Sequence, residues 1–286
     1  MNIVLGGLAA WGLVAGGLYL FQDRLIFPRH ATGEAEHPLP DGSEKLRLDT
    51  ADGHVIHGHF IRARRPGRGL LLGFTGNAWN ARDCFTFLAR RIDDFDIAVF
   101  HYRGYAPSEG EPGQQALFED AVLIHDTLVK GLSPHRVYTV GFSLGSGVAA
   151  WLASQRPIAG QILVTPFDSI EAIARRRYRI VPVSVLLRHP FRSIDHLRDV
   201  DIPTAVIAAG QDTVVPPVRT ETLVRSLRHL AMYKVVPDTS HSGIYDLDII
   251  TDLLHDALDA VEGGASSGTG GTRSQEPEPS PVRVHR

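Results

Sequence analysis

Gly141-Phe142-Ser143-Leu144-Gly145 is the stretch of sequence that decides the fold of this 286-residue chain. It spells G-x-S-x-G. The β-branched and aromatic run at 136–140 before it predicts a buried strand, and residues 146–153 after it predict a helix. A strand, a sharp turn and a helix lift the serine of such a motif into a strained and exposed position, where its hydroxyl acts as a nucleophile. The alternative is an ordinary serine at the start of a helix. Residues elsewhere in the chain are needed to distinguish the two interpretations.

Strand and helix patterns alternate through the middle of the chain. The predicted strands are 44–49, 54–61, 70–74, 97–100, 137–140, 161–164, 205–208 and 232–236. Besides 146–153, the predicted helices are about 81–91, 115–130, 218–230 and 249–261. Because strands that are apolar throughout are buried on both faces, we predict an α/β fold with a mostly parallel eight-stranded sheet flanked by helices. Functional residues in such sheets lie at the carboxyl ends of the strands, and Ser143 is at such an end.

Two further residues can complete a catalytic triad with the serine. A serine hydroxyl needs a histidine to take its proton and an acid to orient that histidine. In this kind of sheet the chain order is serine, acid, histidine. Asp212 and His241 each come just after one of the last two predicted strands, so we predict that Ser143, Asp212 and His241 form the triad. Asp168 follows the strand before and is the rival acid, although we favour an N-cap role for it.

A tetrahedral intermediate also needs two backbone N–H donors, which together form an oxyanion hole. Leu144 is one predicted donor, because it begins the helix after the serine. Asn77 is the other, in the loop 75–80 that follows a predicted strand, because the residue after the loop glycine usually turns its N–H inward. A plain Gly-Asn turn is the alternative for this loop.

The composition excludes several classes of function. The net charge is −3 and the sequence pI about 6.5, so no basic surplus indicates a nucleic-acid partner. The fourteen histidines form no zinc-site spacing, and no G-x-G-x-x-G or Walker pattern opens a helix after a strand. We therefore predict no metal and no cofactor. The single cysteine, Cys84, lies in an amphipathic stretch and is predicted to be a packed core thiol rather than a catalytic one.

The amino-terminal segment differs from the middle of the chain. Residues 3–21 are uncharged and mostly apolar, which is just long enough to span a bilayer as a helix. We predict a single-pass transmembrane anchor at residues 1–22, with a cleaved signal peptide and a soluble core helix as alternatives. Arg24 and Arg29 follow the segment, so the positive-inside rule favours a cytoplasmic main domain. At the other end, residues 263–286 are mostly Gly, Ser, Thr, Glu and Pro, with too few apolar residues to offset the entropy of ordering, and are predicted to be a disordered tail.

Taken together, these segments resemble the α/β-hydrolase superfamily, and within it the membrane-anchored abhydrolase-domain proteins related to the serine aminopeptidase-like branch. The resemblance runs from about residue 18 to residue 261 and gives a main domain at 23–262. Besides the residues already named, it rests on Gln22-Asp23-Arg24-Leu25-Ile26-Phe27-Pro28, Gly76-Asn77-Ala78 with Asn80, Tyr102-Arg103-Gly104-Tyr105-Ala106-Pro107-Ser108-Glu109-Gly110, Pro166-Phe167 with Ser169, and Val215-Pro216. The chain departs from the family pattern at Thr75-Gly76 and Ala209-Gly210, where His-Gly is usual.

The resemblance implies a serine hydrolase of the esterase, lipase or thioesterase kind, which cleaves ester, thioester or amide bonds of small-molecule or lipid acyl substrates through an acyl-enzyme. Peptidase activity is less favoured. The segment 168–200 is the implied cap, and because it is short we expect an open, shallow and apolar pocket. The four arginines within 175–179 either meet acidic lipid headgroups or form a solvated helix face. A non-catalytic membrane-tethered scaffold and an acyltransferase are the alternative functions.

Overall fold

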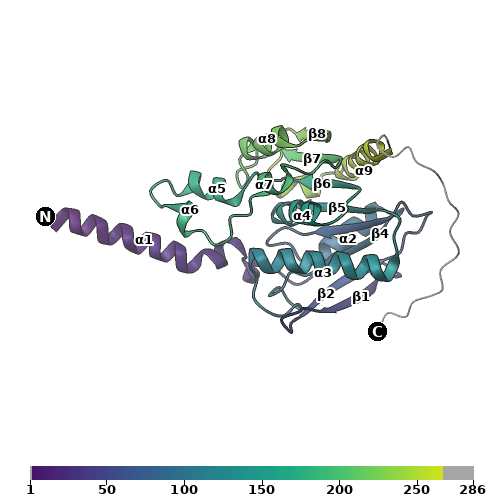
Figure 1. Cartoon of the computed structure of the whole chain (residues 1–286), viewed down its shortest axis with the longest axis horizontal. Helices are drawn as coiled ribbons and strands as arrows, with labels where there is room; N and C mark the ends of the chain where they lie inside the picture. Colours follow the sequence, from purple (N-terminus) through teal and green to yellow (C-terminus); the bar gives the residue numbers. More distant parts are fainter. Residues whose placement is uncertain (1, 267–286) are drawn as a thin grey trace.

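The computed structural model describes residues 2–266 and places eight strands in one sheet, in the order β1-β2-β4-β3-β5-β6-β7-β8. The strands from β3 to β8 run parallel to one another, and β2 is antiparallel to both β1 and β4. This confirms the predicted mostly parallel sheet (Figure 1). Its strands are β1 (Glu44–Asp49), β2 (Val55–Ile61), β3 (Leu70–Phe74), β4 (Asp96–Phe100), β5 (Val137–Phe142), β6 (Gly160–Val164), β7 (Thr204–Ala209) and β8 (Leu230–Val236).

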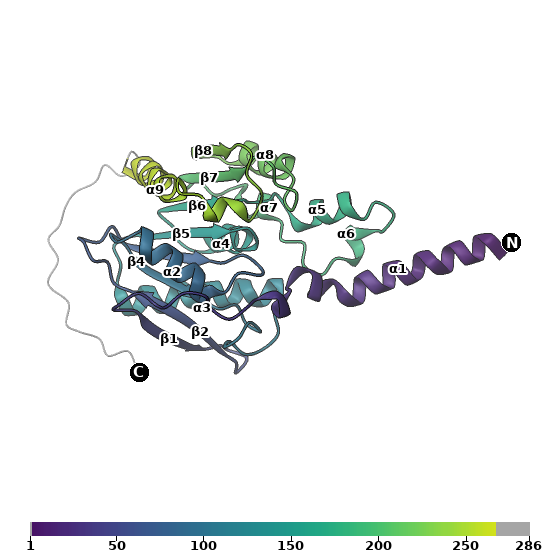
Figure 2. The ribbon, with the colours of Figure 1, turned by 180° about the vertical axis from the view of Figure 1, so that it is seen from behind.

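Helices cover both faces of the sheet (Figures 1 and 2). They are α1 (Asn2–Ile26), α2 (Ala81–Arg91), α3 (Gln114–Leu132), α4 (Leu144–Gln155), α5 (Ile170–Arg177), α6 (Val183–Leu186), α7 (Ser193–Leu197), α8 (Pro217–Ser226) and α9 (Ile250–Ser266), with short 3-10 turns at Arg29–Ala31 and Gly243–Asp246. Apolar side chains of α3, α4 and α8 pack on one face, and those of α2 and α9 pack on the other. Successive residues of β3 alternate between the two faces, since Leu70 and Leu72 lie in one core and Leu71 in the other.

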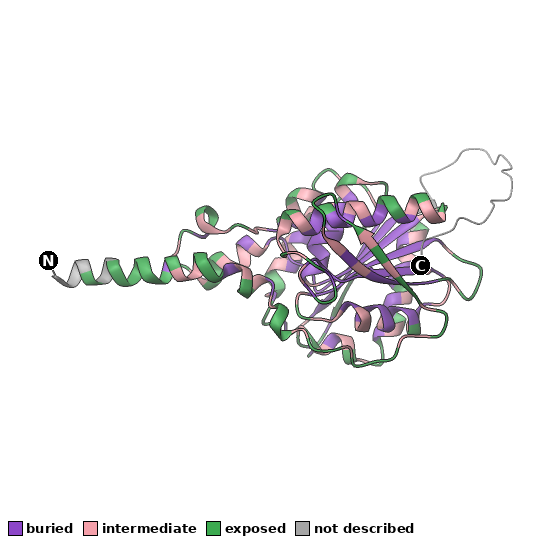
Figure 3. Cartoon of the chain, turned by 90° about the horizontal axis from the view of Figure 1, so that it is seen from below, coloured by how far each residue is buried: buried purple, intermediate pink, exposed green. Residues whose placement is uncertain are grey.

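Buried residues concentrate in the sheet and on the inner faces of these helices, whereas the outer part of α1 projects away from the domain (Figure 3). All five residues of β3 and all six of β5 are buried, as expected for central strands with helices on both sides. The single cysteine, Cys84, is completely buried in α2, and burial raises the pKa of its thiol. It is the packed core thiol that the sequence predicts.

The amino-terminal helix forms, but no helix within the described residues is both long and apolar enough to cross a membrane. Near its carboxyl end α1 carries the polar run Gln22-Asp23-Arg24, and the helix ends at Ile26. Gln22 and Asp23 of this run contact the domain: Gln22 hydrogen-bonds to Leu186 and Arg188, and Asp23 hydrogen-bonds to Arg188. The structure therefore gives no support to the predicted anchor at 1–22, to the membrane localisation or to the cytoplasmic orientation deduced from it.

The ends of the predicted domain also differ in detail from the structure. The boundary expected between residues 22 and 23 falls inside α1, which continues to Ile26. At the other end, α9 includes residues 263–266, which the sequence assigns to the tail. The remainder of the predicted disordered tail, residues 267–286, lies outside the described residues.

Candidate active site

Ser143 occupies the sharp turn between β5 and α4. Its backbone has φ 49° and ψ −114°, a conformation that L-residues seldom adopt. Only glycine fits at the flanking motif positions: a Cβ at Gly145 would lie 2.1 Å from the carbonyl oxygen of Phe74, and one at Gly141 would lie 2.5 Å from the carbonyl oxygen of Gly145. The two glycines let α4 start tightly against the sheet, and this packing holds the serine in its unusual conformation.

Three side chains from separate strand ends meet at this turn. The Nε2 atom of His241, which follows β8, lies 2.8 Å from the Oγ atom of Ser143. The Nδ1 atom of the same ring lies 2.6 Å from a carboxylate oxygen of Asp212, which follows β7. The structure thus brings together the serine, histidine and acid that the sequence places in this chain order.

The surroundings of Asp212 fix its carboxylate. Its second oxygen accepts hydrogen bonds from the backbone N–H groups of Val214, at 2.9 Å, and Val215, at 2.7 Å. The Asp212 side chain is only 4% exposed and that of His241 14%. With the carboxylate accepting from Nδ1–H, the Nε2 atom of His241 carries the lone pair that faces the serine hydroxyl. This geometry suits proton transfer from Ser143 to the imidazole.

The two predicted oxyanion donors lie on either side of the serine. Leu144 is the first residue of α4, and the loop that carries Asn77 passes close by, since a Cβ built on Gly76 would lie 3.8 Å from the Cβ of Ser143. Neither the Leu144 nor the Asn77 backbone N–H donates to a neighbouring backbone carbonyl in the part of the chain that the structure describes. The side chain of Asn77 donates from Nδ2 to the carbonyl oxygen of Ile26, 3.2 Å away.

The carboxylate of the rival acid, Asp168, has other hydrogen-bond partners than His241. One of its carboxylate oxygens accepts from Nη1 of Arg219 at 2.9 Å and the other from the backbone N–H of Ser169 at 2.7 Å. Burial raises the pKa of Asp168. The N-cap role expected for Asp168 belongs to Ser169, whose Oγ accepts from the Ala172 N–H at 3.0 Å at the start of α5.

Two aromatic residues that the sequence analysis did not single out pack close to the site. Trp79 stacks on Tyr245, with ring centroids 5.1 Å apart, and meets the ring of Phe142 edge-on at 5.2 Å. The Tyr245 hydroxyl lies 3.1 Å from the hydroxyl of Thr165, and burial raises the pKa of Tyr245. Trp79 lies in the loop 75–80 that carries Asn77. Its position in that loop is the sequence feature from which its place near the site could have been predicted.

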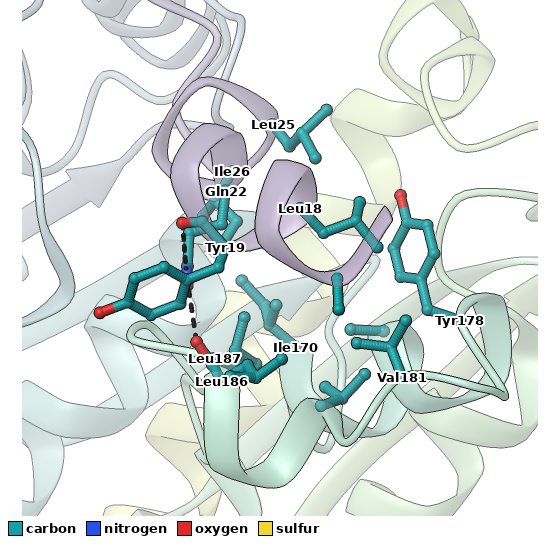
Figure 4. A pocket seen from close by; sticks show the side chains of 13 residues that line it. Leu18, Tyr19, Gln22, Leu25, Ile26, Ile170, Tyr178, Val181, Leu186 and Leu187 are labelled. Carbon is teal, nitrogen blue, oxygen red and sulfur yellow. Dashed lines mark hydrogen bonds between the residues drawn. The ribbon is translucent and has the colours of Figure 1, made fainter. Parts of the chain in front are cut away.

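An apolar cleft lies between α1 and the cap helices α5 and α6, with a volume of about 100 Å³ (Figure 4). Its lining residues are Ala15, Leu18, Tyr19, Gln22, Leu25, Ile26, Ile170, Ala174, Tyr178, Val181, Val183, Leu186 and Leu187. The cap arginines within 175–179 are exposed, as both the lipid-headgroup and the solvated-face interpretations require. Within residues 2–266 no group of three or more His, Cys, Asp or Glu side chains is arranged to hold a metal ion.

Known proteins share both the sequence and the fold. A family model described as the alpha/beta hydrolase fold matches residues 70–182. The chain is 34% identical to the uncharacterized protein Rv2307c of Mycobacterium tuberculosis over 241 residues, covering 80% of this chain and 85% of that protein. It is 28% identical to the alpha/beta hydrolase domain-containing protein WAV2 of Arabidopsis thaliana, covering 72% and 76%.

Among solved structures, the esterase Pf2001 of Pyrococcus furiosus superimposes with a TM-score of 0.61. The match covers 80% of this chain and all of the esterase at 15% identity, a level at which the likeness shows the fold alone. The family match, the relatives and the observed strand order agree with one another. The chain therefore belongs to the α/β-hydrolase family.

Proposed function

We propose that this protein is a serine hydrolase that cleaves ester, thioester or amide bonds of acyl substrates through a covalent acyl-enzyme. In this proposal Ser143 is the nucleophile, His241 the general base and acid, and Asp212 the residue that orients the histidine. The observation that carries the proposal is the imidazole of His241, which bridges the other two side chains at 2.8 and 2.6 Å at the strained turn.

The reaction begins when the Ser143 Oγ attacks the substrate carbonyl carbon while Nε2 of His241 takes the hydroxyl proton. The carbonyl oxygen becomes an oxyanion, which accepts hydrogen bonds from the backbone N–H groups of Leu144 and Asn77. When the intermediate collapses, the bond to the leaving group breaks, and His241 gives its proton to that group. A water molecule, deprotonated by His241, then attacks the acyl-enzyme and releases the carboxylic acid and the free serine.

Asp212 supports this cycle without exchanging a proton. Its carboxylate holds the Nδ1–H tautomer of His241 and stabilises the imidazolium that forms in each transition state. The backbone N–H groups of Val214 and Val215 bind the other oxygen at 2.9 and 2.7 Å, so the carboxylate keeps one orientation while the histidine changes its charge.

The apolar surroundings favour acyl substrates over peptides. The cleft between α1 and the cap is lined by aliphatic and tyrosine side chains and one glutamine, and none of the described lining residues is charged. Such a lining suits a hydrocarbon chain, and it offers no ion pair to the terminal amine or carboxylate of a peptide.

A hydrolysis profile tests the proposal. Purified wild type and Ser143→Ala would be compared on p-nitrophenyl esters of increasing chain length, on an acyl-thioester and on an aminoacyl amide. We expect the wild type to hydrolyse esters and the variant to lose a factor of about 10⁴–10⁶ in kcat.

Ser154→Ala is the matched control, because Ser154 lies on the same helix and its Oγ donates to the Trp151 carbonyl of that helix. This variant should retain wild-type turnover. Equal turnover by Ser143→Ala and wild type would exclude the proposed function.

A further inference from the structure

The segment 237–246, which we call the histidine loop, is fastened to the sheet on both sides of His241. The backbone of His241 itself makes no backbone–backbone hydrogen bond with the residues that the structure describes. Before it, the carbonyl oxygen of Thr239 accepts from the backbone N–H of Gln211, after β7, at 2.9 Å. After it, the hydroxyl of Tyr245 lies 3.1 Å from the Oγ1 atom of Thr165, at the end of β6. The imidazole is therefore placed by the contacts of its neighbours rather than by the backbone of His241.

A short chain of hydrogen bonds joins Tyr245 to the backbone of Ser143. The Thr165 hydroxyl donates to the carbonyl oxygen of Val164 at 2.8 Å. Because this bond uses the only hydroxyl proton of Thr165, the Tyr245 hydroxyl is the donor in the contact between the two side chains. The same Val164 oxygen accepts the backbone N–H of Ser143 at 2.9 Å. One carbonyl group therefore binds both the backbone of the serine and the hydroxyl that holds the histidine loop.

Thr165 presents its hydroxyl from an unfavourable backbone conformation. Its φ is 48°, which glycine adopts readily and a β-branched residue seldom does. It also precedes Pro166, and a residue before proline normally has an extended backbone. Backbone strain of this kind concentrates at functional sites. Glycine would fit the angle with less strain, which points to a role for the threonine side chain.

The ring of Tyr245 also contacts the two other segments of the candidate site. It stacks on Trp79, with ring centroids 5.1 Å apart, in the loop that carries Asn77. It meets the ring of Phe142 edge-on at 5.8 Å, and Phe142 directly precedes Ser143. A single side chain thus contacts the segments that carry the nucleophile, the base and one predicted oxyanion donor.

We propose that Tyr245 and Thr165 are positioning residues, which hold the histidine loop so that His241 stays within hydrogen-bond distance of Ser143. The inference rests on the proposed function, because it concerns how the same site is aligned. A misplacement of about 1 Å can lower turnover about a hundredfold. Burial raises the pKa of Tyr245, so its hydroxyl keeps its proton over the pH range in which imidazoles titrate. Its role is alignment rather than proton transfer.

Removing either hydroxyl should lower kcat with little change in KM. Tyr245→Phe keeps the ring contacts and loses only the oxygen. We expect its kcat on p-nitrophenyl acetate to fall about 10- to 100-fold, by the same factor at every pH, because alignment changes and no ionisation does. Thr165→Ala should show a similar loss, and Thr165→Ser, which restores the hydroxyl, should recover most of it. The double variant should be no slower than the slower single variant, because the two groups act through one hydrogen bond.

Thr165→Gly separates alignment from stability. Glycine suits the positive φ angle, so we expect a urea midpoint at or above that of Thr165→Ala, whereas kcat falls as in Tyr245→Phe. Tyr233→Phe is the control, because Tyr233 lies on the edge strand β8 and is 38% exposed. It should keep the wild-type kcat. A wild-type kcat in folded Tyr245→Phe or Thr165→Gly, while hydrolysis still depends on Ser143, would overturn the positioning role and leave the proposed function standing.

A spectroscopic measurement tests the positioning role without turnover. In protein with isotope-labelled histidine, the nitrogen chemical shift of His241 Nε2 reports whether the Ser143 hydroxyl donates to it. Ser143→Ala gives the value for the broken contact. We expect Tyr245→Phe to move the wild-type resonance toward that value and Tyr233→Phe to leave it in place. This result would support the positioning role even if the wild type hydrolysed no ester, and an unmoved resonance in Tyr245→Phe would overturn it.

Discussion

Two buried aspartates follow neighbouring strands, and their hydrogen-bond partners give them different roles. Asp212, after β7, faces His241 at 2.6 Å. Asp168, after β6, faces the guanidinium of Arg219 at 2.9 Å. Both carboxylates are about equally buried, at 6% and 5% exposure, so burial alone does not distinguish them. The partner does, because only Asp212 can set the tautomer of the histidine beside the serine.

Replacing each aspartate by asparagine should separate catalysis from stability. Asp212→Asn favours the wrong tautomer of His241 and should lower kcat by about 10³–10⁴ with little change in the unfolding midpoint. Asp168→Asn leaves the Arg219 charge without its counter-ion and should destabilise the fold by about 1–3 kcal/mol, while each folded molecule keeps its kcat. Steady-state kinetics and urea unfolding measure both effects. The reverse pattern would make Asp168 the working acid.

At the residue scale the sequence predicts a great deal of the candidate site. The order of Ser143, Asp212 and His241 along the chain, each after a strand, was enough to place the three side chains together. The partner of Asp168 could not be foreseen, because Arg219 lies 51 residues away on α8. An arginine within a polar helix pattern carries no local sign of which carboxylate it will meet.

The sharp turn at Ser143 depends on how closely α4 approaches β3. α4 begins against the end of β3, and the backbone of Gly145 lies so close to Phe74 that a methyl group there would overlap its carbonyl oxygen at 2.1 Å. Backbone atoms cannot move aside as the end of a flexible side chain can. The glycine of the motif is therefore required for packing as well as for the turn.

Gly145→Ala should push α4 away from β3 and disturb Ser143. We expect a loss of several kcal/mol in the free energy of unfolding, as for other overpacked cores, together with a large loss of activity. Gly131→Ala is the control, because Gly131 lies in α3 with nothing within 4 Å of an added Cβ. It should stabilise the protein by about 0.5–1 kcal/mol. Chemical denaturation of the two variants tests this, and similar stabilities would contradict it.

At the element scale the central strands were predictable, whereas the start of the edge strand β8 and the packing of α1 were not. β3 and β5 are buried throughout and carry unbroken apolar runs. β8 is an edge strand with mostly exposed or half-exposed residues, and it begins at Leu230 rather than at residue 232 as predicted. For α1, an apolar helix pattern is the same whether the helix spans a membrane or packs on a cap, so the sequence could not distinguish the two.

At the scale of the whole molecule, a pair of buried histidines makes stability depend on pH. His59 in β2 and His101 after β4 have ring centroids 5.7 Å apart. Burial, reinforced by the nearby charges of Arg82 and Lys45, lowers the pKa of His59 to about 4. Burial and the neighbouring histidines lower the pKa of His101 to about 4 as well.

The sign of the pH effect follows from these shifts. The unfolded chain binds protons at these histidines near pH 6.5, whereas the folded protein binds them only near pH 4. The contribution of these two uncharged histidines to the free energy of unfolding is therefore fully present above pH 6.5. It is lost as the pH falls toward 4, by up to roughly 3 kcal/mol for each histidine.

Urea unfolding at pH 7 and at pH 4.5 measures this loss. A double variant, His59→Gln with His101→Gln, should show a much smaller difference between the two pH values than the wild type. His135→Gln, at an exposed histidine, should behave like the wild type. A double variant with the full wild-type pH dependence would assign the acid sensitivity to other groups.

The central claim is that Ser143 is a nucleophile activated by His241, and covalent labelling tests it most directly. The folded protein would be treated with a fluorophosphonate probe, digested, and analysed by mass spectrometry to locate the adduct. We predict one adduct, on Ser143, and none in Ser143→Ala. The rate of labelling should fall at least a hundredfold in His241→Ala. Equal labelling of Ser143→Ala, or an adduct on another residue of the wild type, would contradict the account.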